Sequence, residues 1–195
     1  TIMKLKGLLL VPAFAMLCIS GYGQISFEGT LDRVSNAVLL ENGERKYASY
    51  HPSEKIMHVY NEDLSEWKSF PLNIPANLYF DELKSISVKV FNTDRLVELA
   101  YTCIEYRTSN NLESTTNYVD EVYTLLVVNE EGKTVMESEN SRDMKIVDSN
   151  GKRKLLVFKQ TGDGKDGLNE QVDVYSLPES AAGNRNFPFD DFRGI

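Results

Sequence analysis

The sequence is short of the residues that build reactive sites. It holds two cysteines, two histidines and one tryptophan in 195 residues. The two histidines, His51 and His58, have no cysteine near them and do not show the HExxH spacing of a helical zinc site. A cysteine nucleophile would also need one of them as its partner. The sequence therefore predicts structural or solvent-exposed roles for both histidines.

Basic residues are also scarce. The chain has 21 lysines and arginines against 29 aspartates and glutamates, a formal net charge of −8. Proteins bind nucleic acids mainly by neutralising phosphates with basic side chains, and they adhere to anionic membranes in the same way. This charge balance excludes nucleic acid as a partner and disfavours adhesion to an anionic membrane surface.

Long apolar runs are missing except at the start of the chain. Lys4 and Lys6 precede the apolar segment Gly7–Ile19, which is shorter than the ~20 residues of a membrane-spanning helix. Gly21-Tyr22-Gly23 then places small residues where a signal peptidase cuts. We expect a signal peptide over residues 1–23 and a mature protein that begins at Gln24. The expected location is secreted or at the cell surface (periplasmic or extracellular), with no membrane insertion after cleavage.

The cysteines allow one alternative to this leader. A lipoprotein would carry its lipid on Cys18, but the residue before a lipidated cysteine is small, and Leu17 is large. If the leader is removed, Cys103 is the one cysteine left, so no intramolecular disulfide can form. Cys103 alternates with Leu99 and Tyr101, which predicts a buried, inert thiol.

No segment after the leader shows a sustained helical stripe, and hydrophobic residues recur with a period close to two. Turn-forming residues such as Asn42-Gly43 separate the apolar runs. The sequence therefore predicts an all-β fold with nine or more antiparallel strands. It predicts one β-rich domain over residues 24–180 and a flexible tail over 181–195. Three hairpins are expected: Lys46–Tyr50 with Lys55–Tyr60, Leu96–Arg107 with Glu121–Asn129, and Lys154–Gln160 with Gln171–Ser176. The expected buried set is Val59, Trp67, Ile86, Val88, Leu99, Tyr101, Val127, Ile146, Leu156 and Val174.

Three strands end alike and suggest an internal repeat. They are Ile56–Asn61, Leu125–Glu130 and Val172–Ser176, and each follows another apolar strand. Closed propellers need about four to eight blades, and this chain has length for about three. We therefore expect an antiparallel meander of hairpins, arranged as propeller-like blades or as a two-sheet sandwich, and not a closed propeller.

The middle of the chain resembles secreted Bacteroidetes β-rich repeat proteins of the kind carried by the type IX secretion system. The similarity covers about Arg45–Pro178, and it is carried by Ile56–Tyr60, Leu64–Phe70 with its tryptophan, Ile74–Tyr79, Val97–Tyr101, Val127–Gly132 and Val174–Pro178. The resemblance implies export and a β-rich fold, and it supplies no catalytic residues. In that group a sorting domain follows the leucine-proline. Here only residues 179–195 follow, so we expect that domain to be missing or truncated.

Two polar loops suggest calcium. They run from Asp148 to Gly151 and from Gly162 to Leu168, and they resemble the aspartate-rich hairpin loops of integrin-type propeller repeats. Calcium takes six to eight oxygen ligands, here offered by Asp148, Asn150, Asp163 and Asp166. The pattern is broken, because Lys159 and Thr161 occupy the first two ligand positions of the second loop. Ordinary turns explain both loops, so no cofactor is expected, with calcium as the alternative.

Aromatic residues crowd the first half of the chain. Tyr50, Tyr60, Trp67 and Tyr79 are candidate ligand contacts, although core packing also explains aromatics in a β-fold. Two functions follow. The first is a secreted, non-catalytic binding or structural module for an extracellular carbohydrate or protein. The alternative is a secreted glycoside-type hydrolase using a pair of carboxylates, which would meet in space rather than in sequence.

Overall fold

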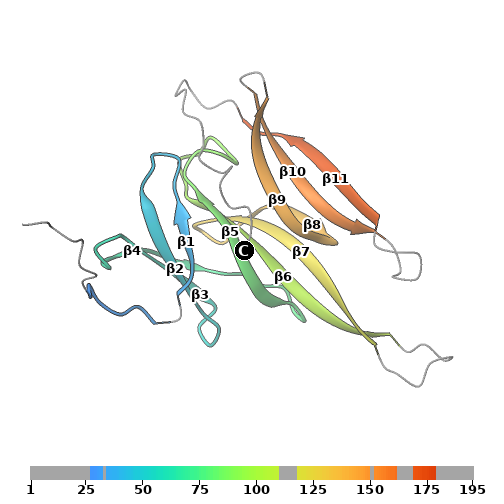
Figure 1. Ribbon diagram of the computed structural model, residues 1–195, viewed down its shortest axis with the longest axis horizontal. Helices are drawn as coiled ribbons and strands as arrows, with labels where there is room; N and C mark the ends of the chain where they lie inside the picture. The colour runs from blue at the N-terminus through green and yellow to red at the C-terminus, as the bar shows by residue number, and fades with distance from the viewer. Residues whose placement is uncertain (1–26, 33, 110–117, 150–151, 162–168, 179–195) are drawn as a thin grey trace, which may run out of the picture.

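The computed structural model describes residues 27–32, 34–109, 118–149, 152–161 and 169–178. Eleven β-strands make up the regular structure of these residues, and none of them is helical (Figure 1). The predicted leader, residues 1–23, and the predicted tail, residues 181–195, lie outside the described residues. The all-β class is confirmed.

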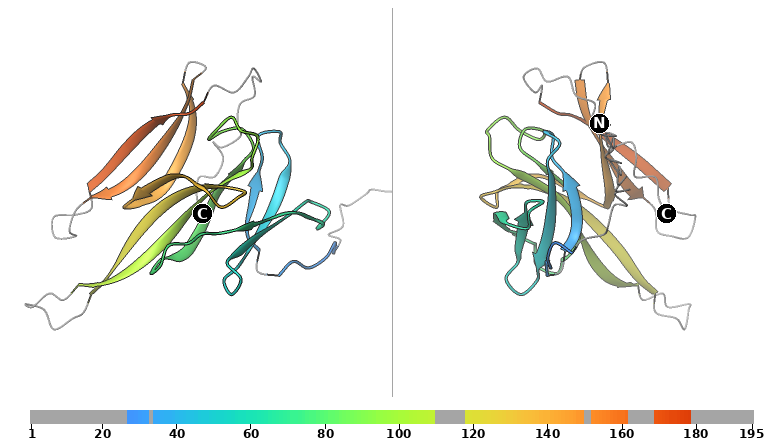
Figure 2. Two further views of the ribbon diagram at one scale, coloured as in Figure 1. Left: turned by 180° about the vertical axis from the view of Figure 1, so that it is seen from behind. Right: turned by 60° about the vertical axis from the view of Figure 1, so that its left-hand side comes forward.

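The strands form three antiparallel sheets, and within each sheet neighbours follow one another along the chain. None of the three sheets is closed into a ring, as predicted (Figure 2). The first sheet contains β1 (Val34–Leu39), β2 (Arg45–His51), β3 (Ile56–Tyr60) and β4 (Glu66–Pro71); the second contains β5 (Tyr79–Ser87), β6 (Glu98–Ser109), β7 (Tyr118–Asn129) and β8 (Thr134–Glu139); the third contains β9 (Ser141–Ser149), β10 (Lys152–Thr161) and β11 (Asn169–Ser176).

The internal repeat of the sequence corresponds to this order. The three similar segments form β3, β7 and β11, which are the third strands of their sheets. An up-and-down meander of this kind is the way a propeller blade is built. The first two sheets have a fourth strand, whereas in the described residues the third sheet ends at β11.

All three predicted hairpins are present. β2 pairs with β3, β6 with β7, and β10 with β11. Two further hairpins, β1–β2 and β7–β8, turn at a glycine with positive φ, Gly43 at 86° and Gly132 at 80°. These turns close with the same backbone hydrogen bonds, Gly43 N–H to the Leu40 carbonyl and Gly132 N–H to the Asn129 carbonyl. A positive φ is cheap for glycine, which is why these loop sequences fix the hairpins.

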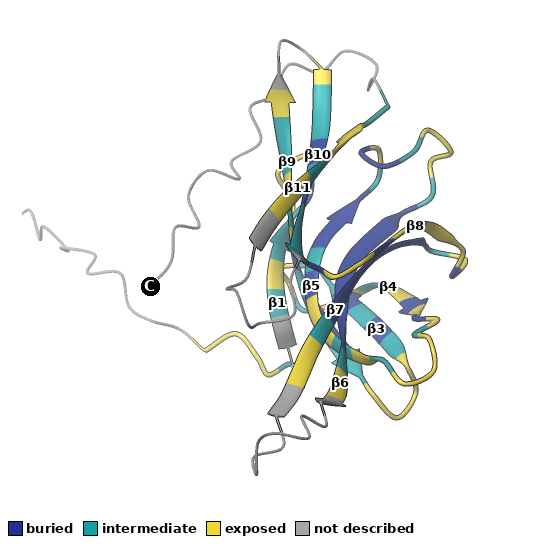
Figure 3. Ribbon diagram, turned by 90° about the vertical axis from the view of Figure 1, so that its right-hand side faces the viewer, coloured by how far each residue is buried: buried dark blue, intermediate teal, exposed yellow. Residues whose placement is uncertain are grey.

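The second sheet is buried on both faces and forms the middle layer (Figure 3). On one face Leu99, Tyr101 and Cys103 pack against the first sheet. On the other face Ala100 and Val127 pack against the third sheet. A sheet covered on both sides needs apolar residues at consecutive positions, and this explains the near-continuous apolar runs of β6 and β7. Burial also raises the pKa of the Cys103 thiol to about 12, in keeping with the inert thiol predicted.

The predicted buried set is right in the middle layer and partly wrong elsewhere. Val59, Ile86, Leu99, Tyr101 and Val127 are buried. Trp67, Val88, Ile146 and Leu156 are only partly buried, and Val174 is 61% exposed.

In the third sheet the prediction is wrong about which face of the strands packs against the core. Leu155 and Val157 point toward the middle layer, so Leu156 lies on the outer face, where Val174 is its partner. Because β10 is apolar at four consecutive positions, 155–158, its alternation does not say which face is inside.

This placement predicts different costs for two matched truncations. Val157→Ala removes two methyl groups from a fully buried position and should lower the free energy of unfolding by about 2 kcal/mol. Val174→Ala makes the same change at an exposed position of the paired strand and should stay within about 0.5 kcal/mol of wild type. Urea denaturation measures both. Equal losses would mean that the third sheet does not pack through this face.

Candidate functional site

The outer face of the first sheet carries polar and ionisable side chains. Ala48, Met57 and Val59 point inward and are fully buried. Alternation along the same strands turns His51 and His58 to the opposite face. The inner face of the first sheet thus belongs to the core, and its outer face carries both histidines.

The turn between β2 and β3 places a carboxylate, that of Glu54, close to these histidines. The Glu54 amide donates to the His51 carbonyl, 3.2 Å away, and closes a four-residue turn. Pro52 occupies the second position of this turn, where its fixed φ is favourable. Lys55 then takes a positive φ of 54° and returns the chain into β3. The turn therefore holds Glu54 beside the end of β2.

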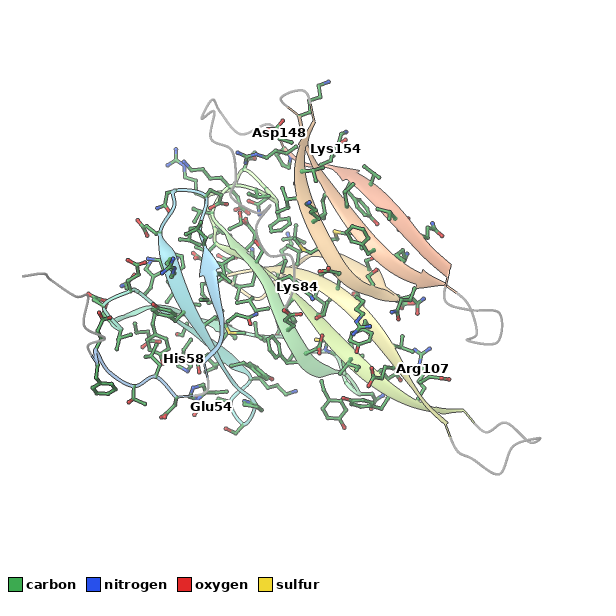
Figure 4. The ribbon with its side chains drawn as sticks, viewed as in Figure 1. Glu54, His58, Lys84, Arg107, Asp148 and Lys154 are labelled. Carbon is green, nitrogen blue, oxygen red and sulfur yellow. The ribbon has the colours of Figure 1, made fainter. Side chains whose placement is uncertain are left out.

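The strand register completes the group. His51 pairs with Ile56, so His58, two residues further along β3, lies diagonally across from His51 on the same face. The two imidazole rings meet edge to face with centroids 4.7 Å apart. One ligand atom each of His51, Glu54 and His58 lies within 4.8 Å of the others. Glu54 and His58 are labelled at the lower end of this sheet in Figure 4.

A neighbouring carboxylate holds one histidine, while one ring nitrogen of the other lacks a hydrogen-bond partner among the described residues. His58 Nδ1 lies 2.9 Å from Glu66 Oε1. His51 Nε2 is buried and has no hydrogen-bond partner among the described residues. Tyr60 stacks beside His58 at 6.4 Å, and burial, followed by the nearby Glu66 carboxylate, raises the pKa of Tyr60. Two imidazoles and a carboxylate converge here, with a second carboxylate behind one of them.

The four aromatic residues predicted from the sequence do not form one surface. Tyr50 packs against Phe80 with ring centroids 4.4 Å apart and belongs to the margin of the core. Trp67 is also packed against the core, and the Lys46 ammonium lies 4.9 Å above its ring. Tyr60 belongs to the histidine group. Tyr79 is 63% exposed on the second sheet.

Tyr79 has a partner that sequence reasoning missed. The ring of Tyr106, 54% exposed, lies 6.1 Å from the Tyr79 ring. Beside them the Tyr123 hydroxyl donates to Glu121, which pairs with Tyr106 across the β6–β7 ladder. We call Tyr79, Tyr106, Glu121 and Tyr123 the tyrosine platform. It lies toward the far end of the long β6–β7 hairpin, near the labelled Arg107 (Figure 4).

Tyr79 and Tyr106 are exposed because the covering sheet ends beside them, whereas Tyr123 is only 8% exposed. Arg142 of β9 lies 5.2 Å above the Tyr123 ring and marks the limit of the third sheet. Beyond that point no strand of the described residues covers the same face of the second sheet (Figure 1). The sequence holds one signal for this. The predicted strand Leu96–Arg107 is twice as long as most other strands, so part of it must extend past its neighbours.

Of the four residues predicted to bind calcium, the structure describes one. Asp148 lies exposed near the end of β9, opposite Arg153 of β10. Asn150, Asp163 and Asp166 lie outside the described residues. Calcium binding at these loops stays a prediction.

One carboxyl group among the described residues has a raised pKa. Burial, followed by the charges of Asp94, Glu41 and Glu130, raises the pKa of Glu98 to about 8. Glu98 is 0% exposed, and neither carboxylate oxygen has a hydrogen-bond partner in the described part of the chain. A general acid must reach its substrate. A fully buried carboxyl does not offer a glycoside such an acid.

Comparisons of the chain with protein-family models, with curated proteins and with solved structures found no significant match. Within the part of the chain that the structure describes, no helix is long and apolar enough to span a membrane. Function must therefore be inferred from the chain's own residues.

The burial of Glu98 predicts a pH-dependent stability. The pKa of Glu98 is higher in the folded protein than in the unfolded chain. Burial of Glu98 therefore does not reduce the free energy of unfolding below about pH 4, and this free energy falls as the pH rises toward 8. Glu98→Gln removes this titration. Between pH 4 and pH 8 wild type should lose on the order of 3 kcal/mol relative to Glu98→Gln, measured by urea denaturation. The control Glu137→Gln, at an exposed position of β8, should follow wild type. Parallel profiles for wild type and Glu98→Gln would contradict the assignment.

Proposed function

We propose that this chain is an exported, non-catalytic binding module whose tyrosine platform contacts a carbohydrate. The single observation that carries the proposal is the exposed pair of Tyr79 and Tyr106 on one face of paired strands. Large exposed aromatics are costly to leave in water, and a close pair of them commonly marks a binding surface. The flat apolar faces of sugar rings can pack on tyrosine rings, while polar neighbours take up their hydroxyl groups.

The neighbours of the pair supply such polar contacts. Glu121 offers carboxylate oxygens as acceptors, and the Tyr123 hydroxyl donates to it at 2.9 Å. Burial, together with this hydrogen bond, raises the pKa of Tyr123, so its hydroxyl stays protonated at neutral pH. The guanidinium of Arg142 is a further donor beside Tyr123. Aromatic faces bordered by acceptors and donors suit a polyhydroxylated ligand.

The platform is also rigid. Its residues sit on β5, β6 and β7, which are paired from Tyr79 to Ile104 and from Ile104 to Tyr123. A preformed surface loses little conformational entropy when it binds. The acidic net charge of −8 argues for a neutral glycan rather than a polyanion.

The proposal also includes where the protein acts and which kind of protein it resembles. The apolar leader supports export, and the resemblance to type IX secretion cargo supports a place at the outer surface of a Bacteroidetes-type cell. A binding module that retains a glycan there needs no catalytic residues. The hydrolase alternative finds less support, because the carboxyl with the raised pKa is fully buried.

Binding to an array of neutral oligosaccharides tests the proposal. The full chain should retain at least one glycan class, and Tyr79→Ala or Tyr106→Ala should each weaken binding about tenfold, the equivalent of ~1.4 kcal/mol of lost ring contact. Tyr175→Ala, a partly exposed tyrosine on β11, is the matched control and should bind like wild type.

Two results would contradict the proposal. One is glycan binding that survives the loss of both platform tyrosines. The other is the release of reducing sugar from a bound polysaccharide, which would make the chain a hydrolase.

A further inference from the structure

We propose that His51, Glu54 and His58 bind one divalent transition-metal ion of the zinc type on the outer face of the β2–β3 hairpin. The proposal is independent of the tyrosine platform, which lies on a different sheet. The HExxH spacing does not apply here, because these ligands lie on a hairpin rather than on a helix.

The distances are close to those of a metal site. One ligand atom of each residue lies within 4.8 Å of the other two. Ligands around a tetrahedral zinc ion lie about 3.3 Å apart, given bonds of 2.0–2.1 Å. The gap is therefore about 1.5 Å at most. Glu54 is exposed in the turn, so rotation of its side chain can close the distance without moving the strands.

An unpartnered nitrogen points to a missing ligand. His51 Nε2 is buried and has no hydrogen-bond partner among the described residues. A buried polar atom is usually satisfied, so an unsatisfied one calls for an explanation. A metal ion at this nitrogen would supply the missing interaction.

The second histidine is oriented in the way a metal ligand is. Glu66 Oε1 lies 2.9 Å from His58 Nδ1. Metal-binding histidines usually donate their other ring nitrogen to a carboxylate or carbonyl, which fixes the tautomer and makes the free nitrogen a better ligand. With Nδ1 held by Glu66, the lone pair of His58 Nε2 is available. Glu66 is thus a positioning residue rather than a ligand.

The donor set selects the class of ion. Two imidazole nitrogens and one carboxylate oxygen suit zinc and its neighbours, whereas calcium and magnesium prefer oxygen ligands alone. Three protein ligands leave a fourth position for water. Because the ligands come from β2, the turn and β3, a bound ion would tie this hairpin together and raise the melting temperature.

The test is a zinc titration of the full chain without a histidine tag, followed by competition with a chromophoric chelator. One ion per chain should bind, the melting temperature should rise by several degrees, and cobalt in place of zinc should give the visible absorption of a four-coordinate site. His51→Gln and His58→Gln should each weaken binding at least 100-fold. Glu54→Gln, an exposed position at which folding is not at risk, should weaken it at least tenfold.

Two further variants distinguish the orientation of His58 by Glu66 from a general effect of removing one negative charge. Glu66→Gln should weaken zinc binding 10- to 100-fold while the stoichiometry stays at one ion. Glu131→Gln, an exposed glutamate in the turn after β7, is the matched control for Glu54→Gln and should leave the affinity unchanged. Unchanged zinc affinity in Glu54→Gln or in the two histidine variants, or no binding by wild type, would overturn the proposal.

Discussion

The ladder between β6 and β7 is the interaction on which the other two sheets depend. The strands pair at twelve consecutive positions, from Glu98 with Asn129 to Ser109 with Tyr118. Along residues 99–103 of β6 and 125–128 of β7 both faces are covered, one by the first sheet and one by the third. Neither outer sheet has a second apolar layer of its own among the described residues, so each gains its burial from this ladder. The cost of the arrangement is visible at Glu98, a carboxyl enclosed without a partner at the start of β6.

Both candidate sites lie where this layered core ends. The exposed platform residues Tyr79 and Tyr106 lie on β5 and β6 where the second sheet extends beyond the third, and the pairing of β5, β6 and β7 makes the platform rigid. The histidine group occupies the outer face of the first sheet, whose inner face is anchored by Met57 and Val59. In each case the core fixes the strand register, and the register decides which side chains share a face. A one-residue slip of β3 would separate His58 from His51 completely.

The sequence predicts the hairpins well because their signals are local. Apolar runs with turn residues between them, such as Asn42-Gly43, determine which strands are neighbours. The choice of face is less well determined where a strand is apolar at consecutive positions. β10 is such a strand, and the sequence predicts Leu156 and its β11 partner Val174 to be inside, although the structure turns them outward. The number of layers is not a local property either, so the sequence alone does not decide between two packed sheets and propeller-like blades.

The candidate sites were less predictable for a related reason. His51 and His58 are seven residues apart, a spacing with no meaning until the turn and the register of β2 and β3 are known. Tyr106 differs from a core aromatic only because the third sheet does not reach it. Hydrogen exchange of the backbone amides tests the central claim most directly. Amides of β6 and β7 between residues 98–104 and 123–129 should exchange slowest, at the rate of global unfolding, while those of the edge strands β1 and β11 exchange through local opening. Slowest exchange in the first or third sheet instead would contradict an architecture that depends on the middle ladder.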